Sequence, residues 1–167
     1  MKEPEIALFL DYLDKVHRRT VRVVEDVPEQ SLDWTPRPGA FSLGDLIRHI
    51  AATKRHMFAE NALGKPSRYQ GCSRDLAGSA EEIREFLNRC HDETISALRG
   101  LSEAQWNAKC TTPGDTSITV WKWMRLMAEH EIHHRGQIYT YLSLLGIATA
   151  PLYGLTSEQV ADKATGD

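Results

Sequence analysis

Apolar residues recur at three- and four-residue spacing through four long segments of the chain, which is the period of a helix with one buried face. These segments are residues 4–27, 43–63, 80–100 and about 118–146. No stretch alternates convincingly with the two-residue period of a strand, and residues 107–117 are expected to form a loop. Four helices of similar length, each with one apolar stripe, predict an all-α protein built as a four-helix bundle.

Residues with strong capping preferences mark the starts of these helices. Ser42 is the expected N-cap of the second helix, and Ser79 with Glu82 forms the S-x-x-E capping box of the third. Short extra helical turns are expected after Ser102 and in the tail, residues 147–167. The helices therefore have locally encoded boundaries as well as periodic faces.

The composition is that of an ordinary globular protein. Its 167 residues are 41% hydrophobic and 26% charged with a net charge of -3, which predicts a single domain over residues 1–167. No basic tract is present to neutralise phosphates, so nucleic acid is not an expected partner. Neither a membrane span of roughly 20 apolar residues nor a secretory signal is expected, because acidic residues interrupt even the first apolar stretch. Three cysteines without a C-x-x-C pair indicate a reducing, cytoplasmic location.

Three of the seven histidines fall within five residues of the last helix. On a wheel of about 100° per residue, His130 and His134 lie about 40° apart in the middle of the apolar stripe, and His133 falls at its edge. A buried imidazole costs free energy unless it finds a partner. Two core histidines bonded to nearby side chains would satisfy the pattern, but an i, i+4 pair centred on the stripe favours convergence on one divalent ion.

The second helix supplies candidates for the remaining ligands. His49 lies in the middle of that helix's apolar stripe and is the expected third ligand. His56 and Glu60 lie further along, where they either line the mouth of a cavity or form a solvated helix end. His17 and His91 lie at the margins of their stripes and are expected to be structural or surface residues.

A second interpretation of the last helix is a zinc-protease motif. The run His130-Glu131-Ile132-His133-His134 satisfies H-E-x-x-H, in which Glu131 would be the general base. The downstream ligand would then be Glu158. Only three positions of this motif are fixed, and no edge strand is predicted that could align an extended peptide. The protease interpretation is therefore the minor one.

Two stretches of the chain resemble the DinB superfamily, which includes bacillithiol S-transferases and, more distantly, mycothiol-dependent enzymes. They are FSLGDLIRHIAATKRHM and MAEHEIHHRGQIYTYLSLLG, the second with an H-x-x-x-H-R-G-Q pattern. The likeness extends to the proline-containing link with Trp34 and to the APLYG tail. It implies a four-helix bundle, often dimeric, in which His49, His130 and His134 bind a divalent metal.

Three neutral imidazoles with a fourth position open would leave the charge of the ion to act on whatever binds there. A bound water would become a hydrolytic nucleophile, and a bound thiol would become a thiolate. The family resemblance favours a thiol-dependent S-transferase that acts on a small-molecule electrophile, with a low-molecular-weight thiol as co-substrate. A metal-dependent hydrolase and a non-enzymatic, metal-stabilised binding module are the alternatives. Zinc and nickel are the favoured ions, since imidazole suits both.

The other polar positions of the last helix divide between its two sides. Glu131 lies beside the stripe and is a tentative catalytic residue, either a base or a group that orients a ligand. Gln137 and Tyr141 project inward, where they give polarity to a cavity or pack in the core. Arg135 is expected on the solvent side. Ile132 lies there too, as does Trp121, and these apolar residues agree with the expected homodimer.

Overall fold

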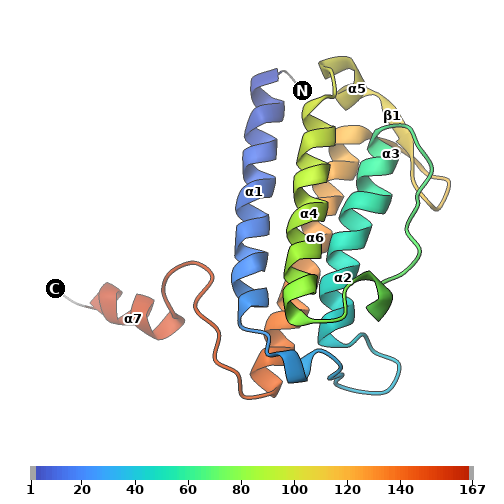
Figure 1. Cartoon of the computed structure of the whole chain (residues 1–167). Coiled ribbons are helices and arrows are strands. Elements are labelled where there is room, and N and C mark those ends of the chain that lie inside the picture. The colour runs from blue at the N-terminus through green and yellow to red at the C-terminus, as the bar shows by residue number, and fades with distance from the viewer. Residues whose placement is uncertain (1–2, 166–167) are drawn as a thin grey trace.

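The computed structural model describes residues 3–165, and in it four long helical rods pack side by side (Figure 1). The rods are α1 (Glu3–Glu25); α2 (Leu43–Thr53), continued by a π turn (Lys54–Ala59) and α3 (Glu60–Ala62); α4 (Ala80–Arg99); and α6 (Val120–Leu144). The predicted all-α four-helix bundle is confirmed, and each predicted helix overlaps an observed rod. The π turn was not predicted, because it leaves the apolar periodicity of the second helix nearly unchanged.

The predicted capping residues start the helices as expected. The Ser42 side chain accepts from the Asp45 backbone N–H, and the Asp45 side chain accepts from the Ser42 backbone N–H. Ser79 and Glu82 form the same reciprocal pair at the start of α4. These boxes satisfy backbone donors that have no partner within the helix, and they fix where α2 and α4 begin.

Short elements connect the rods. They are the 3-10 turns Glu29–Ser31 and Arg74–Leu76, helix α5 (Glu103–Asn107), strands β1 (Lys109–Thr111) and β2 (Ser117–Thr119), and helix α7 (Ser157–Thr165). The two strands pair antiparallel, with Cys110 opposite Ile118, so the expectation of a plain loop over residues 107–117 was wrong. Each strand has only three residues, too few for a two-residue period to be recognised.

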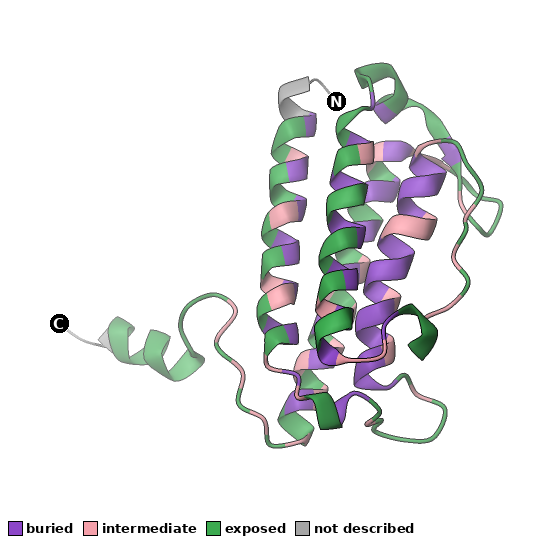
Figure 2. Cartoon of the chain, viewed as in Figure 1, coloured by how far each residue is buried: buried purple, intermediate pink, exposed green. Residues whose placement is uncertain are grey.

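The rods turn their buried residues toward one another (Figure 2), and this interior holds two separate apolar clusters. The first apolar cluster includes Val23, Leu43, Ile47, Leu87 and Leu142. The second apolar cluster includes Leu10, Phe58, Leu98, Trp106 and Met124. Between them, the four rods contribute buried polar side chains, which are the main departure from a simple apolar core.

The last described helix, α7, lies apart from the four rods (Figure 1). Its side chains from Ser157 to residue 164 are all exposed (Figure 2). Among the described residues, no helix is both long and apolar enough to cross a membrane.

Candidate metal centre

The structure brings His49 of α2 together with His130 and His134 of α6. The Nε2 atom of His130 lies 3.1 Å from the Nε2 atoms of both other histidines. One nitrogen from each ring can be chosen so that all three lie within 4.8 Å of one another. In a tetrahedral zinc site with Zn–N distances of about 2.0–2.1 Å, ligand nitrogens are roughly 3.3 Å apart. The spacing of the cluster therefore fits a single small divalent ion.

Hydrogen bonds at the outer ring nitrogens orient two of these imidazoles. His134 Nδ1 donates to Gln137 Oε1 at 2.6 Å. His49 Nδ1 lies 2.7 Å from the hydroxyl oxygen of Tyr69, which can accept from a protonated Nδ1. A proton on each Nδ1 leaves the Nε2 lone pairs facing the centre, where a cation would satisfy them. Gln137 was among the predicted inward residues, but Tyr69 lies in a loop and gave no periodic signal.

The three imidazoles are held in their neutral form. Burial, followed by the nearby His134, lowers the pKa of His49 to about 4. Burial also lowers the pKa of His130 to about 3, with further contributions from His134 and His49, and it lowers the pKa of His134. A neutral imidazole is the metal-binding form, so an ion would have no proton to displace near neutral pH.

Aromatic rings surround the cluster but do not seal it. Phe58 packs 5.5 Å from the His130 ring, and Phe41, which is 41% exposed, packs 5.1 Å from the His49 ring. The predicted inward residue Tyr141 is half-buried and meets the ring of Trp34 edge-on at 5.3 Å. The three histidines themselves are each half-buried.

The structure places Glu131 in a different cluster from its neighbour His130. Its Oε2 atom lies 2.7 Å from Lys54 Nζ, and the residue is only 2% exposed. Burial by itself would raise the pKa of this carboxyl, but Lys54 and His17 outweigh it and lower the pKa. Glu131 is thus a buried carboxylate whose charge is paired with Lys54. The H-E-x-x-H interpretation fails on this point and because Glu158 lies exposed on α7.

Other polar residues also lie in places that the sequence did not predict. Arg135, expected on the solvent side, is 3% exposed and donates to the Val16 carbonyl at 3.1 Å. His17 and His91 are buried, so the structural one of their two expected roles holds. Glu60 is buried in ion pairs with two arginines, so it is neither at a cavity mouth nor at a solvated end. The wheel failed at these positions because neighbouring rods cover more than one face of each helix.

The fold and the site together define this protein as a four-helix-bundle protein in which three neutral histidines converge between two rods. The chain belongs to the DinB superfamily, whose sequence model matches residues 12–138. The family resemblance seen in the sequence is therefore confirmed.

Known proteins of similar sequence and fold agree with this assignment. The chain is 25% identical over 142 residues to the uncharacterised protein YjoA of Bacillus subtilis (strain 168), covering 82% of this chain and 89% of YjoA. The crystal structure of YjoA, a DinB-like protein, matches with a TM-score of 0.71 at 22% identity, over 88% of this chain and 97% of that one.

Two further solved structures share the fold. YfiT from Bacillus subtilis, described as a probable metal-dependent hydrolase with an unusual four-helix bundle topology, matches with a TM-score of 0.71 at 17% identity, over 89% of this chain and 91% of that one. A mycothiol-dependent maleylpyruvate isomerase matches with a TM-score of 0.63 at 13% identity, over 83% of this chain and 63% of the isomerase. At these identities the likeness shows the fold alone.

Proposed function

We propose that this protein is a metal-dependent enzyme in which His49, His130 and His134 hold a divalent ion, with zinc or nickel favoured. The observation that carries the proposal is the convergence of three neutral imidazoles at a half-buried point. Among residues 3–165, this group contains no Asp, Glu or Cys, so a coordination position is left for a substrate. A structural site would instead take four protein ligands and exclude solvent, which argues against the metal-stabilised binding module.

The substrate that best fits this centre is a low-molecular-weight thiol, which would be transferred to a small electrophile. When bound, the ion would supply a Lewis acid that lowers the pKa of a thiol or a water reaching it. The chain's own contribution is to bring three uncharged rings together and to orient two of them. Gln137 orients His134, and Tyr69 orients His49. The likeness in fold to a mycothiol-dependent isomerase supports a thiol as the co-substrate.

Hydrolysis is the second candidate, supported by the description of YfiT as a probable metal-dependent hydrolase. Many hydrolases place a carboxylate beside the attacking water as a general base. Here Glu131, the carboxylate next in sequence to His130, is already paired with Lys54 at 2.7 Å. A thiol needs no such base once its pKa is lowered, so this geometry favours transfer over hydrolysis.

The test is a reaction panel with metal-loaded protein. Glutathione, cysteine and other low-molecular-weight thiols are each incubated with a chloronitrobenzene, and loss of the thiol is followed. We expect thiol consumption that requires metal and disappears after chelation or in His134→Ala. The variant His133→Ala is the control, because His133 is exposed and outside the converging group. Hydrolysis of ester or amide substrates without any thiol consumption would reverse the preference.

A further inference from the structure

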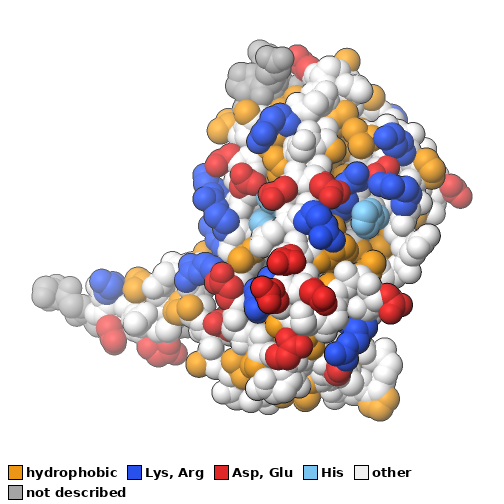
Figure 3. Space-filling model, in the orientation of Figure 1, with side chains coloured by type: hydrophobic (Ala, Val, Ile, Leu, Met, Phe, Trp, Pro, Cys, Tyr) orange, Lys and Arg blue, Asp and Glu red, His pale blue; other side chains and the backbone are white. Residues whose placement is uncertain are grey.

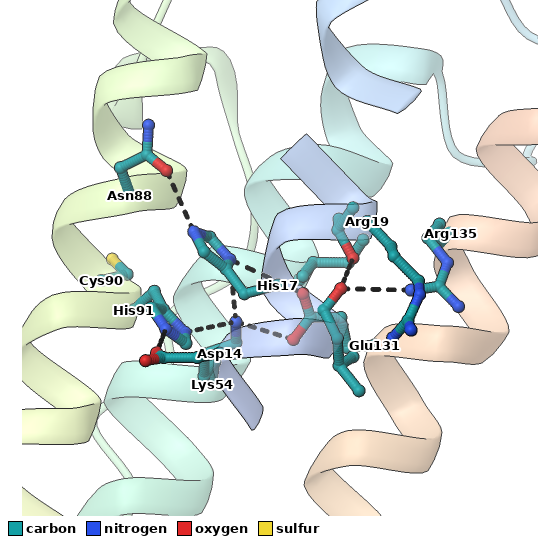
Figure 4. A network of polar contacts seen from close by, with 12 residues as sticks. Asp14, His17, Arg19, Lys54, Asn88, Cys90, His91, Glu131 and Arg135 are labelled. Atoms are coloured by element: carbon teal, nitrogen blue, oxygen red, sulfur yellow. Dashed lines mark hydrogen bonds and ion pairs between the residues drawn. The ribbon is translucent and has the colours of Figure 1, made fainter. Parts of the chain in front are cut away.

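A layer of histidine and charged side chains crosses the bundle between the first and second apolar clusters (Figure 4). On α6, Glu131 and Arg135 lie between Ala128 of the second cluster and Ile138 of the first. His17 on α1, Lys54 at the start of the π turn and His91 on α4 likewise each lie between residues of the two clusters on their own rod. All four rods thus contribute to this polar layer at one level of the bundle.

The Lys54 ammonium is the centre of the polar layer. Its Nζ atom lies 2.7 Å from Glu131 Oε2, 3.3 Å from His91 Nδ1 and 3.4 Å from His17 Nδ1, so its three N–H groups have three acceptors. Because both Nδ1 atoms accept, the protons of these imidazoles are on Nε2. These Nε2 atoms donate to Asp14 Oδ1 at 2.7 Å and to Asn88 Oδ1 at 2.9 Å. The arrangement fixes the tautomer of each ring.

This buried ion pair is not explained by stability alone. Removing two charges from water is expensive, and replacing a buried pair with apolar residues is often neutral or stabilising. Glu131 Oε1 is buried without a hydrogen-bond partner among the described residues, which adds to the cost. The best-attested role of such pairs is to fix the register of packed elements.

Here the ion pair fixes the register between the second rod and α6, which are the two rods that carry the candidate ligands. His49 meets His130 at 3.1 Å, and Lys54 meets Glu131 at 2.7 Å. The two contacts join the same rods through adjacent residues of α6. The side chains of the two apolar clusters tolerate small shifts of α6 against the second rod. The buried ion pair does not, because a shift would leave both charges unpaired. A shift of α6 that breaks the ion pair would also separate the histidines.

We infer that Lys54 and Glu131 are positioning residues that set the axial and rotational register of α6 against the second rod, so that His49 reaches His130 and His134. They pair with each other outside the group of three histidines. This inference rests on the proposed metal binding. It assigns a role to the only Glu of the H-E-x-x-H run without making it a base.

A matched pair of variants tests the inference. Glu129 and Glu131 flank His130 in the sequence, but Glu129 is exposed and pairs with Arg125 at 3.3 Å. We compare Glu131→Leu with Glu129→Leu by titrating each apoprotein with Co²⁺ and recording its visible absorption bands, which report ligand geometry. Glu131→Leu should bind Co²⁺ about 10- to 100-fold more weakly, the usual loss when a supporting partner of a metal site is removed, and its bands should change. Glu129→Leu should match the wild type.

Two milder variants keep the test decisive if Glu131→Leu fails to fold. Glu131→Gln keeps an oxygen acceptor for Lys54 and should lose less affinity than Glu131→Leu. Lys54→Arg keeps the cation and should bind better than Lys54→Met. Folded Glu131 and Lys54 variants with wild-type Co²⁺ affinity and spectra would overturn the inference and leave the proposed function standing. If the wild-type protein itself bound no Co²⁺, that result would contradict both the inference and the proposed function.

Discussion

The bundle holds two clusters of histidines that solve the same problem differently. In the polar layer, His17 and His91 stack with ring centroids 3.8 Å apart, and their inward lone pairs share the Lys54 ammonium. In the candidate metal centre, the Nε2 atoms of His49 and His134 face that of His130 with no protein cation among them. The first cluster is complete within the chain. The second has three facing imidazole nitrogens, and this difference supports the proposed metal site there.

The largest effect should come from removing the internal cation. Lys54→Met leaves Glu131 as an uncompensated buried charge, which typically costs about 3–5 kcal/mol of unfolding free energy. Lys122→Met is the matched control, because Lys122 is exposed and its Nζ atom lies over the Trp121 ring, 5.5 Å from the ring centroid. It should cost less than about 1 kcal/mol. Urea denaturation of both variants measures the difference, and equal losses would show that the polar layer is not held by its ion pair.

The next largest effect should be a loss of metal affinity when a histidine of the candidate metal centre is removed. His130→Ala and His134→Ala should each lower zinc affinity by at least about 100-fold, beyond the roughly 10- to 100-fold loss of a supporting partner. Occupancy after dialysis should then fall below half. Elemental analysis and a chelator competition measure this, with His91→Ala as a control from the other cluster. Full metal retention in both variants would contradict the proposed site.

A smaller effect should appear in the folding stability of the protein in acid, because His91 of the polar layer is held neutral. Burial, followed by Lys54 and His17, lowers the pKa of His91 to about 4, while Asp14 and Glu131 oppose this shift. Between that value and the ordinary pKa near 6.5, the unfolded state binds a proton that the folded state does not, so stability falls as pH falls. From pH 6.5 to 5 the loss should be about 2 kcal/mol, at roughly 1.4 kcal/mol per pH unit.

This acid dependence is measured as a difference between two metal-free proteins. The wild type and His91→Gln are unfolded in urea at several pH values, and His91→Gln should show the shallower decline. The histidines of the candidate metal centre are common to both proteins, so their contributions cancel in the comparison. Parallel pH profiles would mean that His91 is protonated as easily in the fold as outside it.

The smallest effect should come from the bond that orients a single ring. Gln137→Leu removes the acceptor of His134 Nδ1–H, at 2.6 Å, without removing the ring itself. Zinc affinity should fall by about 10-fold, the lower end of the range for supporting partners. Thr140→Val, one turn further along the exposed side of α6, should leave the affinity unchanged. A loss as large as that of His134→Ala would instead make Gln137 a ligand.

The sequence predicted well whatever depends on local periodicity and capping. The four rods, the N-cap at Ser42, the capping box at Ser79, and the central positions of His49, His130 and His134 all follow from spacing along single helices. Predictions failed where burial depends on several neighbours. Arg135 and Glu131 lie off the apolar stripe of α6, yet contacts with α1 and the second rod bury both of them.

The division between what the chain encodes locally and what the fold decides has a physical reason. Helix period and caps act within a few residues, so the sequence alone determined the bundle and placed two histidines one turn apart. Whether a polar residue meets solvent, a cation or an empty coordination position depends on side chains dozens of residues away, such as Lys54 opposite Glu131. Only the tertiary structure could separate the histidines that already have a cation from those that do not.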